Sequence, residues 1–372
     1  MKIRAIREVR GYQVHYADDQ RCLASKALTL YESYDQGKTW RQMYHLPAPL
    51  YKSLPLRFSP YRRLIRGGVH SVSPIQTDPE QGWIIVADRK LFYLPDHKQN
   101  AEVIFHINRG RRPLRRGVAI LNDQILVGEY WRNPEREPVN LHRIRAAGRR
   151  SDVLYRFDQG KVRHIHAVEV DPYSQLLWVA TGDEDSECMI MTIDPQSTQA
   201  NIVGCGSQKW RTASFAMRPD AVYWGTDNHL GENQIRRYVR ATNTTEKVAD
   251  VTGPVYYNVC MDEAVIFGTT MEKGEGQQDG FGRLYALNNR GIVEEVWRQK
   301  KDRWGARFFG YGVFEFAEGR LSGNRFWVTA RGFEGGLRSI LFKLEDDQPS
   351  PPGPLSQKLG EGESRSDGGE NQ

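Results

Sequence analysis

A five-residue pattern of hydrophobic and polar positions recurs along the chain. Each copy has three large apolar residues, then Ala, Gly or Thr, and in most copies a polar residue. Six copies are clear: IIVAD (84–88), ILVGE (125–129), LWVAT (177–181), VYWGT (222–226), VIFGT (265–269) and FWVTA (326–330). RCLAS (21–25) is a weaker copy. The pattern predicts one β-strand at each copy.

The copies are nearly evenly spaced. From the third residue of one clear copy to the third of the next there are 41, 52, 45, 43 and 61 residues. A four-stranded propeller blade occupies roughly 40–50 residues. An apolar strand precedes each copy and two β-rich segments follow, as in GPVYYNVCMDE (253–263) before VIFGT and KLFYL (90–94) after IIVAD. The sequence therefore predicts an all-β fold, a single seven-bladed β-propeller of four-stranded blades.

The alternative, an extended β-sandwich, would not keep one strand pattern at near-constant spacing. In a propeller, KIRAIREV (2–9) is expected to complete the sheet of the last blade and close the ring. From about Glu345 the chain is rich in Pro, Gly, Ser and acidic residues and poor in large apolar ones. Such a segment buries too little surface to fold. We expect a propeller over residues 1–344 and a disordered tail over 345–372.

Residues 33–40, SYDQGKTW, lie between the third and fourth strands of the first unit. An aspartate here can accept hydrogen bonds from its own turn, and a glycine can adopt a positive φ. The segment resembles the Asp-box, or BNR repeat, of sialidase-like β-propellers; the matching residues are Ser33, Asp35, Gly37, Thr39 and Trp40. RIRAAGRRS (143–151) and TIDPQST (192–198) are degenerate traces at the same place in other units.

The resemblance implies that the box stabilises an outer turn away from the active face, so that Asp35 is not catalytic. True sialidases place an arginine in an Arg-Ile-Pro-like stretch before the first box. That stretch is absent upstream of SYDQGKTW, and sialidase activity is not expected. Other propellers with the box include polysaccharide lyases, xyloglucan hydrolases and noncatalytic assembly factors, so the fold does not select a reaction.

Composition restricts the partners and the compartment. The formal net charge of the 372 residues is +6, which favours an anionic partner but is too small to indicate nucleic acid. The Arg-dense segments 109–116 and 146–151 are interpreted as solvated loops. The chain shows neither a signal peptide nor a membrane-spanning segment, so we expect a soluble, cytoplasmic protein without membrane insertion. Its four cysteines, Cys22, Cys188, Cys205 and Cys260, are expected to be buried and reduced.

Propeller geometry predicts where the functional site lies. The segment that enters the first strand of each blade and the loop that leaves the second strand converge at one end of the axis. The entering segments contribute His70, His164, His166, Gln208, Trp210, Arg211, Tyr256 and Tyr257. The leaving loops contribute Glu129, Asp183, Asp227 and Arg331. A ring of imidazole, guanidinium, phenol and carboxyl groups is difficult to explain as packing alone.

Several of these residues also have structural interpretations. His164 and His166 alternate on a strand and share one face; we favour a hydrogen-bonded pair and expect no metal and no cofactor. Trp210 can stack on a sugar while Arg211 pairs with a carboxylate, or the two can be an inter-blade tryptophan and a structural arginine. Asp183 and Asp227 can equally belong to β-turns.

Two chemistries fit the predicted ring. Glycoside hydrolysis needs two carboxyl groups, here Glu129 and Asp183, and Glu129 is expected to have a raised pKa. Eliminative cleavage of a uronic-acid polymer needs a base, a cation that neutralises the carboxylate, and an acid. The candidates are His166 or His70 as the base, Arg211 as the cation, and Tyr256 or Tyr257 as the acid. The catalytic candidates are therefore Glu129 and Asp183 for hydrolysis and His166 and Arg211 for elimination, and the other members of the ring are candidates for substrate binding.

The sequence therefore predicts a propeller that binds and processes a carbohydrate in an axial pocket, with an anionic oligosaccharide or polysaccharide favoured. The competing function is a noncatalytic scaffold for protein–protein interaction or polysaccharide assembly. A scaffold needs an exposed apolar or aromatic patch, whereas an enzyme needs its polar side chains to converge in one pocket.

Overall fold

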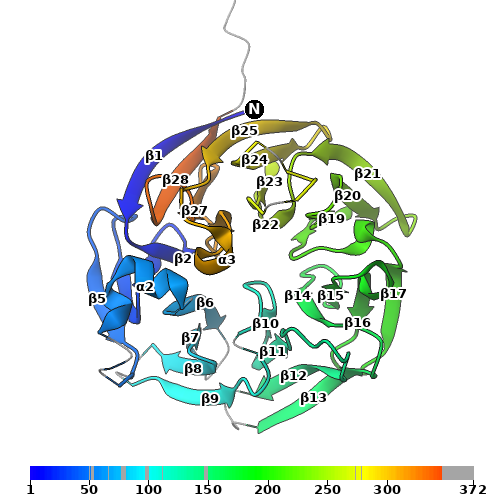
Figure 1. Ribbon diagram of the computed structural model, residues 1–372, viewed down its shortest axis with the longest axis horizontal. Coiled ribbons are helices and arrows are strands. Elements are labelled where there is room, and N and C mark those ends of the chain that lie inside the picture. The colour runs from blue at the N-terminus through cyan, green and yellow to red at the C-terminus, as the bar shows by residue number, and fades with distance from the viewer. Residues whose placement is uncertain are drawn as a thin grey trace, which may run out of the picture.

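Seven four-stranded antiparallel sheets form a closed ring in the computed structural model of the protein (Figure 1). The structure describes residues 1–49, 51, 54–65, 67–76, 81–96, 100–110, 112–145, 150–272, 274–277 and 279–345. The prediction of a seven-bladed β-propeller is confirmed. Each of the six repeated patterns forms the second strand of its sheet, counted outward from the axis.

The strands of the first four blades follow one another along the chain. They are β2 (Gln13–Ala17), β3 (Cys22–Lys26), β4 (Thr29–Ser33) and β5 (Arg41–His45); β6 (Val69–Gln76), β7 (Gln81–Ala87), β8 (Lys90–Pro95) and β9 (Glu102–His106); β10 (Val118–Leu121), β11 (Gln124–Gly128), β12 (Val139–Arg145) and β13 (Arg150–Phe157); β14 (His164–Val170), β15 (Leu177–Gly182), β16 (Met189–Ile193) and β17 (Ala200–Cys205).

The last three blades complete the ring. They are β18 (Ala216–Met217), β19 (Ala221–Gly225), β20 (Asn233–Val239) and β21 (Thr244–Val251); β22 (Val255–Cys260), β23 (Ala264–Thr269), β24 (Phe281–Asn288) and β25 (Val293–Lys300); β26 (Val313–Phe316), β27 (Arg325–Arg331), β28 (Arg338–Glu345) and β1 (Lys2–Arg10). The described helices are α2 (Ser59–Leu64) and α3 (Ala306–Phe309), with single 3-10 turns at η1 (Pro55–Arg57), η2 (Asp185–Glu187) and η3 (Gln208–Trp210).

The ring closes as predicted, by pairing of the two ends of the folded chain. β1 runs antiparallel to β28, from Lys2 opposite Glu345 to Arg10 opposite Arg338. The first residues of the chain thus supply the outermost strand of the last blade (Figure 1). Because this pairing joins residues far apart in sequence, it converts a row of sheets into a ring without an open end.

Packing between blades explains the repeated five-residue pattern. Its apolar run is buried on both faces of the sheet, since each second strand lies between two neighbouring blades. The small residue that follows lies where the next blade approaches. A Cβ atom on Gly128 would lie 2.6 Å from Cγ2 of Ile165, and one on Gly225 would lie 2.4 Å from Cβ of Val255. A larger residue at either place would push two blades apart.

The SYDQGKTW turn connects β4 and β5 and is held by its own side chains. Asp35 accepts hydrogen bonds from the backbone N–H of Thr39 (2.9 Å), the Thr39 hydroxyl (2.7 Å) and the Ser33 hydroxyl (2.8 Å). These bonds, those from Thr39 above all, hold the pKa of Asp35 below its usual value. Arg7 of β1 donates to the Asp35 carbonyl at 3.1 Å, which fastens the first blade to the last. Membership of the Asp-box superfamily stays a prediction.

Gly37 in this turn has φ +83°, and a Cβ atom there would lie 3.0 Å from Trp327. Gly11 has a similar φ of +79° but open space around it. Gly37→Ala is therefore expected to lower the free energy of unfolding by about 2 kcal/mol or more, and Gly11→Ala by about 1–2 kcal/mol, the cost of the left-handed backbone alone. Urea unfolding of both variants measures the difference. An equal loss of unfolding free energy in the two variants would mean that the Trp327 side chain moves away from the added Cβ atom without destabilising the protein.

Two sequence-based expectations concern exposure and order. Cys22 and Cys188 are buried free thiols, as predicted, but the prediction is wrong for Cys205 and Cys260, which are exposed. Both lie at the solvent-facing end of a strand, where one neighbouring apolar residue does not ensure burial. The predicted disordered tail beyond Glu345 and residues 146–149 of the degenerate trace RIRAAGRRS (143–151) lie outside the described residues.

Candidate functional site

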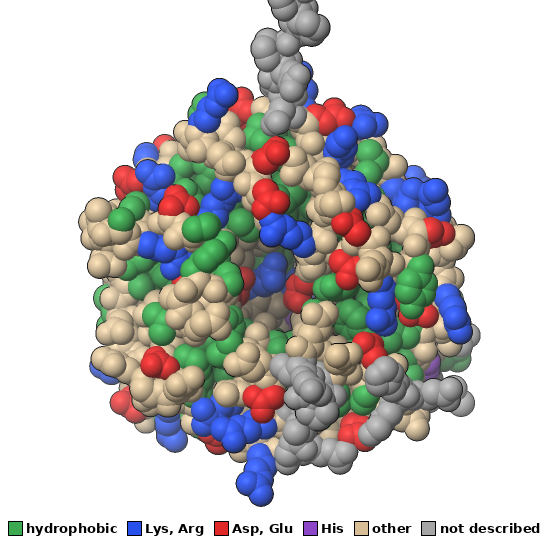
Figure 2. Space-filling model, turned by 180° about the vertical axis from the view of Figure 1, so that it is seen from behind, with side chains coloured by type: hydrophobic (Ala, Val, Ile, Leu, Met, Phe, Trp, Pro, Cys, Tyr) green, Lys and Arg blue, Asp and Glu red, His purple; other side chains and the backbone are tan. Residues whose placement is uncertain are grey.

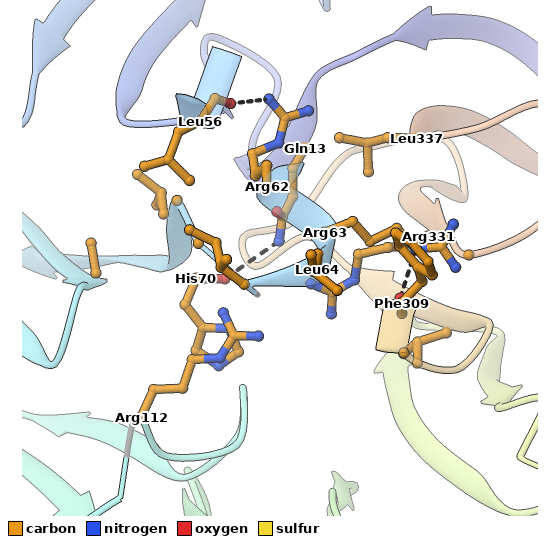
Figure 3. Close-up of a pocket in the computed structure, with 18 of the residues that line it drawn as sticks. Gln13, Leu56, Arg62, Arg63, Leu64, His70, Arg112, Phe309, Arg331 and Leu337 are labelled. Atoms are coloured by element: carbon orange, nitrogen blue, oxygen red, sulfur yellow. Dashed lines mark hydrogen bonds between the residues drawn. The ribbon is translucent and has the colours of Figure 1, made fainter. Parts of the chain in front are cut away.

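A cavity of about 1570 Å³ lies at one end of the propeller axis. Two segments roof part of it: one joins β5 to β6 and contains α2, and the other joins β25 to β26 and contains α3. Arg63 of α2 holds them together, because it donates to the carbonyl of Phe309 at 2.7 Å and pairs with Asp302 (Figure 3). We call these two segments, residues 46–68 and 301–311, the lid. The opposite face is also hollowed at its hub, with basic and acidic side chains around the opening (Figure 2).

The cavity brings together part of the predicted ring. Six predicted residues line it: His70, His164, Asp183, Tyr256, Tyr257 and Arg331. His166, Arg211 and Asp227 lie behind this lining, in contact with Asp183 or with one another. Convergence on one end of the axis is thus observed for nine of the twelve candidates, although they come from separate blades.

Irregular pairing of the innermost strands aims several of these side chains. The register between first and second strands shifts in four blades, and each shift skips one residue: His15, His70, His166 and Tyr256. A bulge turns the extra residue away from the regular alternation of a strand. Equivalent bulges therefore direct three imidazoles and one phenol from four blades toward the axis. The sequence analysis named His70, His166 and Tyr256 but not His15, whose blade contains the weakest copy of the repeated pattern.

His164, His166 and Asp183 form a compact cluster. The Nε2 atoms of the two imidazoles are 2.9 Å apart, and they lie 3.4 Å and 3.2 Å from Oδ1 of Asp183. The two rings meet, as predicted, but through the bulge at His166 and not through regular alternation along the strand. His164 also hydrogen-bonds the carbonyl of Trp131 through Nδ1 (2.7 Å), which turns its Nε2 toward the cluster. Burial lowers the pKa of His166 to about 4, so its ring is neutral at neutral pH.

This triangle is the arrangement among the described residues that can hold a metal ion. Ligand atoms about 2.1 Å from one ion, at angles of 90–110°, are separated by about 3.0–3.4 Å. The three observed separations of 2.9, 3.2 and 3.4 Å have this size. Two imidazole nitrogens and a carboxylate oxygen suit divalent transition metals. The Trp131 carbonyl supplies the supporting hydrogen bond usual for a histidine ligand, whereas Nδ1 of His166 has no hydrogen-bond partner in the part of the chain that the structure describes.

Arg211 connects the cluster to a second carboxyl group. Its guanidinium lies 3.3 Å from Oδ1 of Asp183 and 3.5 Å from Oδ2 of Asp227. Burial raises the pKa of Asp227 to about 8; Arg211 opposes this rise, and the charges of Glu272 and Asp183 add to it. Burial also acts on Asp183, but hydrogen bonds to His164 and His166 outweigh it and its pKa lies below the usual value. One carboxyl group is thus ionised and its neighbour protonated at neutral pH.

The raised pKa of Asp227 predicts how stability depends on pH. Below the ordinary value of 3.8 both the folded and the unfolded chain carry this proton. Between there and about 8 only the folded chain keeps it, so the free energy of unfolding falls as pH rises, by at most about 1.4 kcal/mol per pH unit. Asp227→Asn removes this dependence. Urea unfolding of both proteins from pH 4 to 8 is expected to show the variant gaining relative to the wild type; parallel profiles would contradict the protonated state.

A second buried polar network joins residues of the first and last blades to the segment before the third blade. Glu315 of β26 accepts a hydrogen bond from Gln13 (2.7 Å), pairs with Arg331, and lies 3.8 Å from Arg115. Arg115 donates to the carbonyl of Phe316 at 3.2 Å. Of these residues the sequence reading named only Arg331. Glu315 had a usable signal, since it is an ionisable residue within the apolar run VFEF and such residues are rarely buried without a partner.

Three of the predicted site residues, Glu129, Trp210 and Gln208, do not line the cavity. Glu129 packs against β12, where it accepts hydrogen bonds from the Asn140 N–H (2.9 Å) and pairs with His142 (3.1 Å). Burial alone would raise its pKa, but these bonds lower it, so the prediction of a raised pKa is wrong. Trp210 stacks on Trp224 with ring centroids 5.8 Å apart, as the inter-blade interpretation expects. Gln208 donates to the Asp183 carbonyl at 2.9 Å.

Arg163 is the principal cavity residue that the sequence reading missed. It lines the cavity and lies 2.9 Å from Oδ2 of Asp183. Arg163 directly precedes His164, the first residue that the sequence analysis assigned to the start of this strand, and was therefore not considered.

No protein-family model and no curated protein sequence matches this chain. An oligogalacturonate lyase in complex with manganese superposes with a TM-score of 0.60 and 11% identity, over 91% of this chain and 90% of that one. The oligogalacturonate lyase of Vibrio parahaemolyticus gives 0.57 and 10%, over 92% and 94%. A chain of the mitotic checkpoint complex gives 0.55 and 9%, over 92% of each. At these identities the likeness shows a shared fold. Among the described residues no helix is long and apolar enough to cross a membrane.

Proposed function

We propose that the axial cavity binds an acidic oligosaccharide and cleaves it by β-elimination. The observation that carries this proposal is the charge of the cavity wall: ten lining residues are Lys or Arg and four are Asp or Glu. An excess of cations in a concave, partly desolvated site attracts a polyanion and pairs with its carboxylates. The two oligogalacturonate lyases of the same fold act on an acidic sugar, which supports this substrate class.

His70 is the proposed base. It lines the cavity, is buried, and has both ring nitrogens without a hydrogen-bond partner among the described residues. Burial first, and then the charge of Arg112, lowers its pKa well below the usual value, so the ring is neutral and able to accept a proton. His70 and Arg112 lie side by side, and Arg331 lies across the cavity from them, beside Phe309 (Figure 3). The arginines are placed to bind substrate carboxylates.

The reaction balances with groups present in the cavity. The base takes the C5 proton of a uronate, the C4–O bond breaks, a C4=C5 double bond forms, and the leaving oxygen gains a proton. Tyr256 is the proposed donor of that last proton. It lines the cavity, hydrogen-bonds Glu272 at 3.1 Å, and keeps its proton because burial raises its pKa well above 10. This assignment replaces Glu129 and Asp183 as a hydrolytic pair, since Glu129 does not line the cavity.

A divalent cation at His164, His166 and Asp183 belongs to the same proposal. The sequence favoured a hydrogen-bonded pair without metal, but the size of the triangle and the manganese of the similarly folded lyase support a cation here. When bound, such an ion supplies positive charge that stabilises the carboxylate of a uronate as its C5 proton is removed. Convergence of these groups in one cavity favours an enzyme over a noncatalytic scaffold by the criterion stated above.

The test is a binding and turnover screen with uronic-acid oligosaccharides and neutral oligosaccharides of the same length. We expect the acidic ligands alone to raise the melting temperature, and cleavage to yield a product with the ultraviolet absorbance of a conjugated double bond. His70→Asn is expected to keep binding and to lose about 10²–10⁴-fold in turnover. Glu129→Gln is the control and should behave as the wild type. Failure of every acidic oligosaccharide to bind would overturn the proposal.

A further inference from the structure

The lid carries an unusual share of the exposed apolar surface. Eight of the sixteen large hydrophobic residues that are exposed in the described chain lie within residues 46–68 or 301–311. The six most exposed of them are Tyr51, Leu54, Phe58, Tyr61, Leu64 and Phe308. We call these six the lid patch. Tyr51, Phe58 and Phe308 expose 74%, 67% and 60% of their surface, so they do not belong to the core of the propeller. Exposed apolar side chains gathered in one place mark an interaction site.

The lid patch rests on an ordered base. Leu46 and Leu56 of the same segment are buried in the core between the first two blades. Arg62 donates to the carbonyl of Leu56 at 3.0 Å, and Arg63 joins α2 to the α3 segment through Phe309 and Asp302. The two helices pack against each other, with α2 in front of the first two blades and α3 at the edge of the central opening (Figure 1). Tyr51, Tyr61, Leu64 and Phe308 also line the axial cavity, so the patch lies at the mouth of the cavity, on a segment that is itself anchored.

The charge of the lid is predominantly positive. Among the lid residues whose side chains the structure describes, the basic ones are Arg62 and Arg63 in the α2 segment and Lys301, Arg303 and Arg307 in the α3 segment, and the acidic one is Asp302. In the α3 segment, Arg303 lies over the ring of Trp304 and Arg307 over the ring of Phe308. The acidic residue there, Asp302, is already paired with Arg63 and Lys301. A surface of mixed aromatic, aliphatic and cationic side chains matches the boundary of an anionic bilayer, where rings and methyl groups enter the acyl region and cations meet phosphates.

We propose that the lid patch docks the propeller peripherally on an anionic lipid surface. The aliphatic Leu54 and Leu64 argue for lipid over a sugar chain, because a sugar stacks on aromatic faces and gains little from branched alkyl groups. The predominantly positive charge argues for lipid over a second copy of this chain, because a two-fold contact would place like charges together. Docking in this way turns the mouth of the axial cavity toward the membrane. The proposal stands independently of the reaction assigned to the cavity.

Vesicle co-sedimentation of the full chain tests this proposal. Vesicles of phosphatidylcholine alone are compared with vesicles of equal parts phosphatidylcholine and phosphatidylglycerol. We expect binding to the anionic vesicles, and a loss of about tenfold or more in affinity for the double variant Phe58→Glu/Leu64→Glu. The control is Ile202→Glu/Ile292→Glu, two residues exposed at 62% and 51% on the outer strand β17 and after β24. It should bind as the wild type, and thermal unfolding should confirm that both variants fold.

Salt and oligomeric state supply the remaining tests. Raising the salt from about 0.1 M to about 0.5 M should weaken binding of the wild type, since surface charges are then screened. Binding that is equal on neutral and anionic vesicles, or equally weakened by both double variants, would overturn the proposal. So would a dimer in solution that Phe58→Glu/Leu64→Glu converts to monomer, because the patch would then be the contact between two copies.

Discussion

Replacing Arg211 by methionine is expected to lower the free energy of unfolding by about 3–5 kcal/mol and to abolish cleavage of acidic oligosaccharides. The guanidinium is buried and lies between Asp183 and Asp227. Without it Asp183 keeps the contact with Arg163 but loses the one with Arg211, and Asp227 loses its contact with Arg211. The removed charge cannot be replaced by water in a site this enclosed, so the loss is large. Urea unfolding at neutral pH measures the first effect, and the turnover assay measures the second.

A matched pair separates stability from function. Arg240 and Asp171 form another enclosed ion pair, with contacts of 2.6 Å and 2.9 Å, away from the cavity lining. Arg240→Met should destabilise the protein by a comparable amount and leave binding and turnover unchanged. Adding Asp227→Asn to Arg211→Met should recover part of the stability, because folding then no longer requires Asp227 to take up a proton. If Arg211→Met unfolds at the same urea concentration as the wild type, the two contacts of Arg211 contribute nothing measurable.

The fold was predictable because its signal is local and repeated. Every blade needs a second strand buried on both faces, followed by a small residue where the next blade approaches, as Gly128 and Gly225 illustrate. Because all seven blades pack in the same way, their second strands have similar sequences. Closure by β1 was also predictable, because an isolated apolar–polar strand before the first blade has only the last sheet as a partner.

The site was predictable in outline, since the ring geometry assigns equivalent positions of all blades to one end of the axis. Three physical features were outside its reach. The bulges themselves were not predictable: His70 and His166 were named from their place at the start of a strand, but the change in strand alternation at these residues, and at the unnamed His15, leaves the sequence pattern unaltered. Whether a carboxyl group faces the axis or its own sheet depends on the turn after the strand, and Glu129 turns toward β12. The lid comes from long connections without strand periodicity, so its position over the cavity left no signal.

Asp183→Asn is expected to have the second large effect, on metal binding and on turnover together. Asparagine keeps the shape of the side chain and its carbonyl oxygen but removes the negative charge that the two imidazoles and the arginines surround. An ion held by His164, His166 and a neutral amide loses its one anionic ligand. We expect the affinity for Mn²⁺ to fall by about a hundredfold or more, and turnover of acidic oligosaccharides to fall by about 10²–10³-fold. Titration with Mn²⁺, followed by electron paramagnetic resonance, measures the first quantity without relying on activity.

The control for this prediction is Glu129→Gln, which removes a carboxylate that also pairs with a histidine but lies outside the cavity lining. It should bind Mn²⁺ and turn over substrate as the wild type does. The pair of readouts distinguishes two roles of Asp183. Loss of Mn²⁺ binding together with turnover supports a cation site. If the wild type binds no Mn²⁺ and Asp183→Asn still loses turnover, the role of Asp183 is restricted to orienting His164 and Arg163. Unchanged turnover in the variant would remove Asp183 from the site, because a carboxylate so closely surrounded by these groups cannot be neutralised without disturbing them.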